Sequence, residues 1–228
     1  MGSLIYHLLP DGEKVGVRGK IISFTASLII SDPLVADLNN PRSRFFDYLL
    51  ASNQPLLAGL DHWLFQAGML FGSWEQWWGD GKKRATAHEG LDLCGFQDSL
   101  GAAKMVDPSL KIPAAFAGKI VKIAGDFLGK SIYLNHEIFS EDGFQLYTVY
   151  GHTEPLSSMA PSQEVAEGQI VATLSRSFGK NPTIPPHLHV TFVWLPAPLP
   201  PARLTWQNLS HDPAIRFIDP LTVLAPPL

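Results

Sequence analysis

Four of the eight histidines in the sequence fall, together with one aspartate, into three short motifs. The motifs are His88-Glu-Gly-Leu-Asp92, Tyr150-Gly-His152 and His187-Leu-His189. Two imidazoles and one carboxylate, with a fourth position left to water, form the ligand set of a catalytic zinc site. Zinc lowers the pKa of such a water to about 7, so hydroxide is available at neutral pH. A surplus histidine nearby can accept a proton or stabilise an oxyanion. The three motifs together therefore predict a hydrolytic zinc site.

The spacing within the motifs indicates the elements that position these side chains. Side chains alternate between the two faces of a strand, so His187 and His189 share one face while Leu188 points to the other. His88 and Asp92 are separated by an even number of residues and also share a face if their segment is extended. The glycine between them permits a bend that would bring the two side chains together.

The region that carries the motifs has the residue pattern of a β domain. Short β-like runs alternate with turn residues from residue 88 onward. The runs are Gly90–Cys94, Gly118–Ala124, Ser131–Leu134, Gln145–Tyr150, Gln169–Leu174 and His187–Val193. Many short strands with such turns predict a mainly β fold.

The first 80 residues contain both strand-like and helix-like patterns and no clear motif. The segment from Val15 to Ile30 is typical of one or two strands. Asn40-Pro41 predicts the start of a helix, with Asn as the cap and Pro at the first helical position. Apolar residues follow at helical spacing, namely Phe45, Phe46, Leu49 and Leu50. We therefore expect a mixed α/β N-terminal extension over residues 1–80 and a β domain over residues 81–228.

Composition excludes several classes of function. The 228 residues are 46% hydrophobic, which is enough to bury a core without disulfides or a structural metal ion. The net charge of −4 argues against general attraction to nucleic acid or to an acidic membrane surface. The single cysteine, Cys94, excludes an internal disulfide. No apolar run approaches the ~20 residues of a membrane span, and residues 1–10 lack a signal-peptide pattern.

The motifs resemble those of the lysostaphin-type (LytM-type) zinc endopeptidases, which carry H-x-G-x-D, Y-x-H and P-H-L-H in this order. The segment from Val165 to Val171 also resembles a hairpin of that family between its second and third motifs. Ile218-Asp-Pro-Leu221 is similar to a common family ending. The resemblance covers residues 86 to 224, which is over half of the chain.

The resemblance implies a role for each motif residue. His88, Asp92 and His189 would hold one zinc ion, and His152 and His187 would be the catalytic histidines. The fold would be a large antiparallel sheet forming a groove, similar to a duplicated hybrid motif. The substrate would be stem or cross-bridge peptides of peptidoglycan, and the location the cell envelope or periplasm.

The sequence departs from the family pattern in two places. The third motif continues with Val190-Thr191 where Phe-Glu is usual, which we expect to affect packing more than chemistry. Some relatives place a tyrosine before the first motif, near the oxyanion, and here Arg84 is the candidate for that role.

Other residues near the motifs have ordinary structural interpretations. Trp74, Trp77 and Trp78 either line a groove or form a core seam. We expect Cys94 to be a small buried packing residue and His136 to be structural. Glu89 faces away from the site if its segment is extended.

Other functions fit parts of the pattern. Some relatives lose metal ligands and regulate other wall hydrolases as non-catalytic binding modules, although all five family positions are present here. Carrier domains use similar hairpins. A lipoyl carrier needs a lysine at a hairpin tip, and Lys180 lacks the expected context. A phosphocarrier needs no carboxylate ligand, so Asp92 argues against it. In some relatives an N-terminal segment supplies a fourth metal ligand, for which Asn39 and Asn40 are candidates, but a scaffold role for residues 1–80 is the simpler expectation.

Overall fold

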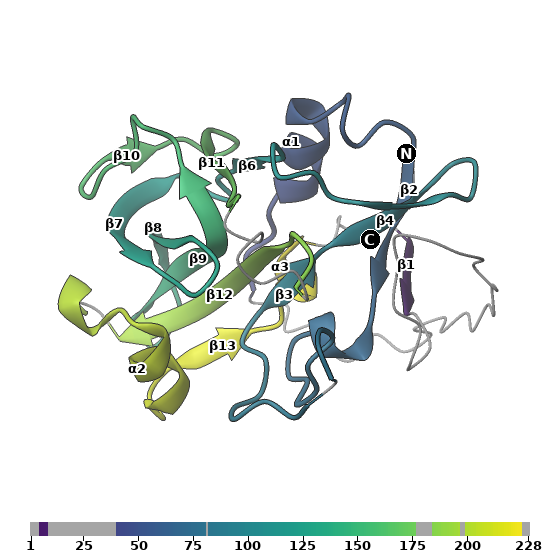
Figure 1. Ribbon diagram of the computed structural model, residues 1–228. Helices are drawn as coiled ribbons and strands as arrows, with labels where there is room; N and C mark the ends of the chain where they lie inside the picture. Colours follow the sequence, from purple (N-terminus) through teal and green to yellow (C-terminus); the bar gives the residue numbers. More distant parts are fainter. Residues whose placement is uncertain (1–4, 9–39, 81, 177–183, 197–198, 225–228) are drawn as a thin grey trace.

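Two β-sheets make up most of the structure, which is a computed structural model describing residues 5–8, 40–80, 82–176, 184–196 and 199–224. The larger sheet has nine antiparallel strands, in the order β10-β7-β8-β9-β11-β6, and β12 pairs with β9, β3 and β13 (Figure 1). These strands are β3 (Leu91–Leu93), β6 (Lys111–Pro113), β7 (Gly118–Gly125), β8 (Lys130–Phe139), β9 (Phe144–Pro155), β10 (Glu164–Val165), β11 (Ile170–Leu174), β12 (Leu188–Pro196) and β13 (Arg216–Ile218). The mainly β class with a large antiparallel sheet is therefore confirmed.

The smaller sheet is joined directly to the larger one. Its four strands are β1 (Ile5–Leu8), β2 (Leu60–Phe65), β4 (Gly95–Asp98) and β5 (Ala103–Met105), in the order β1-β2-β4-β5. Only Cys94 separates β3, in the larger sheet, from β4, in the smaller. Because β2 pairs with β4, the boundary expected near residue 80 falls between neighbouring strands of one sheet. The division into two domains stays a prediction, and the strands expected over residues 15–30 lie outside the described residues.

Strand β12 shows how the alternating sequence builds both the core and the site. Leu188, Val190 and Phe192 point from one face into the main hydrophobic core. His189 and Thr191 point from the opposite face, where they form a hydrogen bond with each other. Beyond them that face continues into a second apolar cluster that contains Val193 and Leu195. The period of two expected for His187 and His189 therefore places both on the polar part of this face.

Helix α1 (Phe45–Ser52) begins four residues later than Asn40-Pro41 indicated. The expected start is wrong because Ser43 is engaged elsewhere: its amide donates to Val223 O and its hydroxyl donates to Ala115 O. The same hydroxyl accepts from the amide of Phe45. These contacts fix the approach to the helix in a non-helical path. The buried residues of the helix are Phe45, Phe46 and Leu49, whereas Leu50 is exposed.

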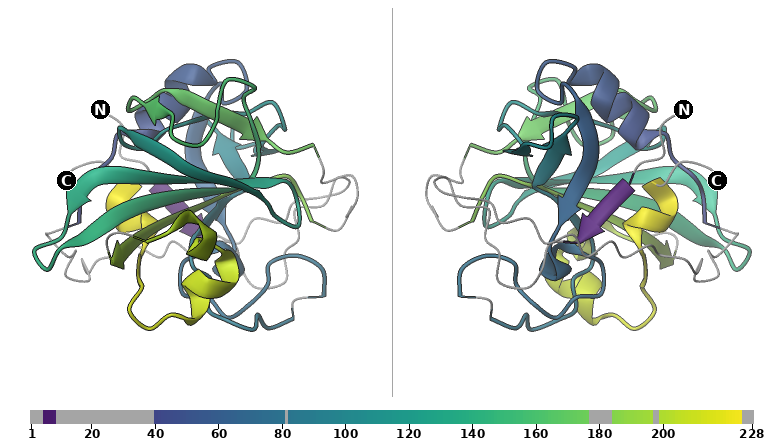
Figure 2. Two further views of the ribbon diagram at one scale, coloured as in Figure 1. Left: turned by 90° about the vertical axis from the view of Figure 1, so that its left-hand side faces the viewer. Right: turned by 90° about the vertical axis from the view of Figure 1, so that its right-hand side faces the viewer.

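The remaining helices are short. They are α2 (Trp206–His211), α3 (Pro220–Leu224) and the 3-10 turns η1 (Ala67–Met69) and η3 (Pro201–Arg203). The two side views place α1 and α2 on opposite sides of the larger sheet, α1 against the main core and α2 against the second apolar cluster (Figure 2). Thr205 caps α2 by accepting a hydrogen bond from the amide of Asn208. Among the described helices, none is long and apolar enough to cross a membrane.

Candidate metal centre

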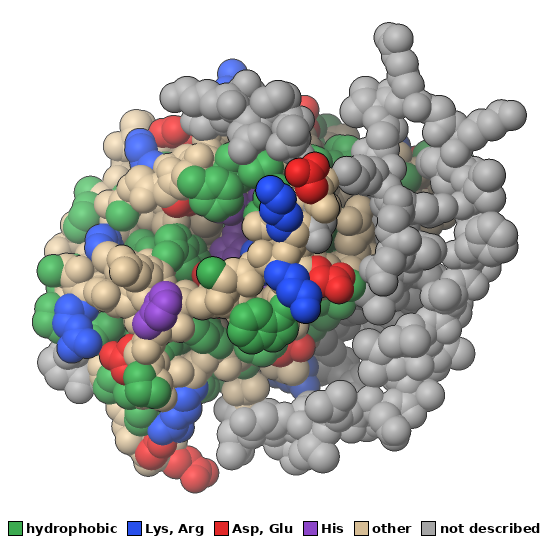
Figure 3. All heavy atoms as spheres, turned by 60° about the horizontal axis from the view of Figure 1, so that its bottom comes forward, with side chains coloured by type: hydrophobic (Ala, Val, Ile, Leu, Met, Phe, Trp, Pro, Cys, Tyr) green, Lys and Arg blue, Asp and Glu red, His purple; other side chains and the backbone are tan. Residues whose placement is uncertain are grey.

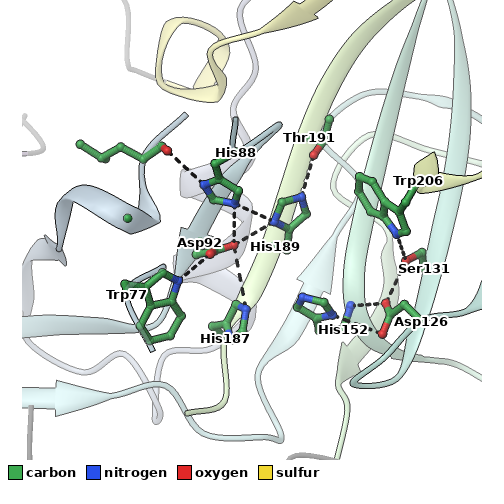
Figure 4. Close-up of polar contacts among 12 residues, drawn as sticks. Trp77, His88, Asp92, Asp126, Ser131, His152, His187, His189, Thr191 and Trp206 are labelled. Atoms are coloured by element: carbon green, nitrogen blue, oxygen red, sulfur yellow. Dashed lines mark hydrogen bonds and ion pairs between the residues drawn. The ribbon is translucent and has the colours of Figure 1, made fainter. Parts of the chain in front are cut away.

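Three ligand atoms from two of the motifs converge at one point. His189 Nδ1 lies 2.8 Å from Asp92 Oδ1 and 3.1 Å from His88 Nε2, and His88 Nε2 lies 3.3 Å from Asp92 Oδ1 (Figure 4). Ligands about 2.0–2.1 Å from a tetrahedral zinc ion are separated from one another by about 3.3 Å. The three atoms therefore already have nearly the spacing that a single small metal ion requires.

The strand register brings these ligands together. His189 on β12 lies directly opposite Asp92 on β3, and Gly90 precedes that strand. A Cβ atom at Gly90 would lie 2.5 Å from Val190 O and 2.7 Å from His189 Nε2. Gly90 is not among the glycines with positive φ. The chain bends at Gly90, as the sequence suggested, and a glycine is also needed there because β12 approaches closely.

Each ligand is held from behind by a second polar group. His88 Nδ1 donates to Leu70 O over 3.0 Å, and His189 Nε2 lies 2.9 Å from Thr191 Oγ1. The indole nitrogen of Trp77 donates to Asp92 Oδ2 over 2.7 Å. Such outer partners orient ligands and fix histidine tautomers in metal sites. Because the outer atoms are engaged, His88 Nε2, Asp92 Oδ1 and His189 Nδ1 are directed inward, and the residues fit one metal ion.

Burial and charge favour the protonation states that a metal needs. Burial alone would raise the pKa of Asp92, but His88, His187 and His189 outweigh it and hold the pKa well below its usual range. Burial lowers the pKa of His189, against the opposing effect of Asp92. Metal ligands must be ionised carboxylates and neutral imidazoles. The cluster therefore holds Asp92 ionised and favours the neutral form of His189.

The two remaining motif histidines lie beside this cluster. The rings of His152 and His187 are 4.8 Å apart between centroids, and His152 is 5.9 Å from the ring of His189. His187 Nδ1 donates to Pro185 O, and its Nε2 lies 4.0 Å from Asp92 Oδ1. The structure thus brings all five motif residues into one site. Their division into ligands and catalytic groups stays a prediction.

The close-up view also reveals residues that sequence patterns did not indicate. Asp126 contacts the ring of His152 with Oδ1 3.2 Å from Nδ1, and Trp206 packs edge-on against His189 at 5.1 Å (Figure 4). Asp126 lies between the expected runs Gly118–Ala124 and Ser131–Leu134, where the sequence predicts only a turn. It lies 26 residues before His152, and no local spacing links the two. The signal available in the sequence was a carboxylate in the turn between two expected strands.

The tryptophan cluster is divided between the site and the surface. Trp77 is buried and lies 5.0 Å from the ring of His187, while Trp78 stacks on the same ring at 6.2 Å. Trp74 is exposed. Arg84 lies over the ring of Trp78, and its Nη2 is 3.7 Å from Asp92 Oδ2. Arg84 therefore contacts the outer oxygen of Asp92, and the oxyanion role suggested for it stays a prediction.

Cys94 and His136, which were expected to be structural residues, are both buried, and neither belongs to the cluster of ligand atoms. Cys94 is buried in the main core, and burial raises the pKa of its thiol. His136 is buried, with Nδ1 donating to Ala117 O and Nε2 2.8 Å from Thr148 Oγ1. Burial lowers the pKa of His136 to about 4.

The site is recessed. His88, Asp92 and His187 each expose only 1% of their surface, and His152 and His189 expose 7%. On the face shown in Figure 3, histidine side chains lie in a hollow among hydrophobic, basic and acidic side chains. This hollow offers a substrate a route to the histidines on this face.

Residues 88–201, half of the chain, match the model of peptidase family M23. No curated protein matches the chain. Among solved structures, the NMR solution structure of lysostaphin is similar, with 17% identity, 71% of this chain and 61% of that chain covered, and a TM-score of 0.39. The catalytic domain of the prophage-encoded M23 protein EnpA from Enterococcus faecalis has 16% identity, covers 55% of this chain and 82% of that chain, and has a TM-score of 0.33. Csd3 from Helicobacter pylori has 18% identity, with 67% of this chain and 37% of that chain covered and a TM-score of 0.35.

Proposed function

The chain belongs to peptidase family M23, and from this membership we propose that it is a zinc-dependent endopeptidase that cleaves stem or cross-bridge peptides of peptidoglycan. One observation carries the proposal: three inward-facing ligand atoms converge beside two further imidazoles. A structural metal site needs no such surplus, whereas hydrolysis needs groups that accept and return a proton. Since peptidoglycan lies outside the cytoplasm, the proposal includes a location in the cell envelope or periplasm.

We assign the metal to His88, Asp92 and His189. When bound, zinc supplies a Lewis acid that polarises a peptide carbonyl and activates a water molecule. The imidazoles of His152 and His187 would then have different catalytic roles, which we assign from the groups that each of them contacts.

We assign the role of proton acceptor to His152. Its Nδ1 faces the carboxylate of Asp126, which stabilises the imidazolium formed when Nε2 takes a proton. The Nδ1 atom of His187 donates to the carbonyl of Pro185, and burial lowers the pKa of His187 to about 3. His187 therefore stays neutral, and we assign to it the orientation of the attacking water. We infer that His152 Nε2 afterwards returns the proton to the leaving amine.

The first experiment is mass spectrometry of muropeptides released from purified peptidoglycan. Zinc-loaded protein is compared with the same protein in chelator, and zinc content is measured alongside. Zinc-dependent loss of particular cross-linked species identifies both the activity and the bond. One bound zinc per chain without new products would refute the peptidase and favour the alternative, a non-catalytic LytM-like module that regulates other wall hydrolases. The near-complete burial of the ligands is the observation that favours this alternative.

Variants separate the two kinds of histidine. His189→Ala is expected to lose both zinc and turnover, whereas His152→Ala keeps zinc and loses turnover. The matched control is His211→Ala, which removes an exposed imidazole on α2 whose Nδ1 bonds only within its own helix, to Gln207 O. If His152→Ala lost zinc as completely as His189→Ala, the assignment of ligands and catalytic histidines would be wrong.

A further inference from the structure

Asp126 makes more contacts than its place in a turn requires. Its Oδ1 accepts hydrogen bonds from the amides of Leu128 and Gly129, over 2.9 and 2.7 Å, as an aspartate in a tight turn commonly does. Its Oδ2 points the other way and accepts from the hydroxyl of Ser131 and from the amide of His152, both over 2.8 Å. The carboxylate thereby joins the β7–β8 turn to β9, which carries the second motif.

The backbone of His152 depends on this carboxylate. His152 has a φ of 62°, in the left-handed region that non-glycine residues rarely adopt. Such residues persist where the surroundings fix them, and they cluster at functional sites. The amide of His152 is fixed by Asp126 Oδ2, and its carbonyl accepts from the amide of Ser175 over 2.9 Å. Both peptide groups of this strained residue are therefore anchored.

The ring of His152 is fixed by the same carboxylate. Burial alone would raise the pKa of Asp126, but the hydrogen bonds and charge of His152, with the turn amides, hold the pKa below its usual range. An ionised carboxylate only accepts hydrogen bonds, so His152 Nδ1 must carry the proton. Nε2 of the neutral ring then has a free lone pair. In Figure 4 the ring lies between Asp126 on one side and His187 and His189 on the other.

We propose that Asp126 is a positioning residue that holds His152 in the Nδ1–H tautomer, with Nε2 presented to the metal cluster as a proton acceptor. The proposal rests on the proposed function for its kinetic part. Its structural part stands on the contacts of Asp126 alone. Trp206 supports the arrangement from α2, because its indole nitrogen donates to Ser131 Oγ over 3.0 Å while its ring packs against His189.

The test measures the tautomer directly. Long-range proton–nitrogen NMR of the histidine rings, recorded with and without zinc at pH 7.5, reports which nitrogen of His152 carries the proton. The His152 signals are assigned by their loss in His152→Gln. We expect the Nδ1–H tautomer in the wild-type chain and a shift toward Nε2–H in Asp126→Asn. An Nε2–H tautomer in the wild-type chain would overturn the proposal, and this measurement stands even if Asp126→Asn fails to fold.

Kinetics supply the second readout. Asp126→Asn is expected to lower kcat about 100-fold, at the low end of the contribution of a positioned base, with zinc content and KM unchanged. Asp98→Asn is the matched control, because Asp98 also accepts two turn amides, from Leu100 and Ala102, but contacts no histidine of the site. An unchanged kcat in folded, zinc-loaded Asp126→Asn would overturn the proposal. If the wild-type chain cleaves no peptidoglycan, the proposed function fails, and the tautomer measurement still decides how His152 is positioned.

Discussion

Replacing Gly90 with alanine tests whether the metal site depends on close packing of β3 against β12. The added Cβ would lie 2.5 Å from Val190 O, 2.6 Å from Thr191 Oγ1 and 2.7 Å from His189 Nε2. Real Cβ atoms do not approach other atoms this closely. Val190 O belongs to a central strand paired on both sides, so β12 resists displacement. The ring of His189 and its hydrogen bond to Thr191 are therefore expected to give way.

The size of the effect follows from these contacts. Forcing an extra methyl group into a close-packed region costs about 1–3 kcal/mol, and loss of a buried hydrogen bond adds about 1 kcal/mol. Alanine also restricts the unfolded chain, which offsets about 0.4–1 kcal/mol. The expected net loss in the free energy of unfolding is about 2 kcal/mol. Loss of the group that orients a metal ligand is expected to weaken zinc binding by about 10- to 100-fold.

Two assays separate these effects. Denaturant unfolding in chelator gives the stability of the metal-free chain, and competition with a zinc indicator gives the affinity. Gly125→Ala is the control, because a Cβ at that position meets nothing within 4 Å, and its effect should stay within about 0.5 kcal/mol. If Gly90→Ala matched this control in both stability and zinc affinity, the reasoning from close packing would be refuted.

Three further predictions concern the supports of the site and the core. Trp77→Phe removes the hydrogen-bond donor to Asp92 Oδ2 and should weaken zinc binding about 10-fold in the indicator assay. Trp74→Phe, at an exposed position, should leave zinc binding unchanged. Equal zinc affinities of the two variants would contradict the role of the Trp77 indole. Burial lowers the pKa of His136 to about 4 in the folded chain. As the pH falls below about 6.5, this histidine therefore becomes protonated in the unfolded chain but stays neutral in the folded chain. Wild type should therefore lose about 2 kcal/mol more stability than His136→Gln between pH 7.5 and pH 5, measured by denaturant unfolding in chelator, and parallel losses would refute this. When free zinc is held at 100 times the Kd of the site, removing the zinc should lower the free energy of unfolding by about 2.7 kcal/mol and lower the Tm. An unchanged Tm would mean that the folded chain does not bind zinc in preference to the unfolded chain.

The sequence predicted most of what depends on local periodicity. All six runs expected from residue 88 onward contain strands, because their alternation of residues matches the period of the sheet. The same period placed His187 and His189 on one face. The pairing of Asp92 with His189 follows from a register between segments almost 100 residues apart. No local pattern specifies such a register.

The errors and omissions have a common physical cause. The expected helix start at Asn40-Pro41 relied on local capping preference, which was overridden by the long-range contacts of Ser43 with Ala115 and Val223. Asp126 was missed as a partner of His152 because their contact depends on the pairing of β7 with β8 and of β8 with β9. In both cases tertiary contacts, and not the neighbouring residues, decide the outcome.

The single residue between β3 and β4 makes the position of Asp92 sensitive to the smaller sheet. Asp92 lies three residues before Gly95, where β4 begins, so a rotation of one sheet against the other pulls on this residue through a few peptide bonds. His152 lies on β9 and its partner Asp126 in the β7–β8 turn, both further along the chain from this junction. Strain at the junction between the sheets would therefore act first on Asp92, within the cluster of candidate metal ligands.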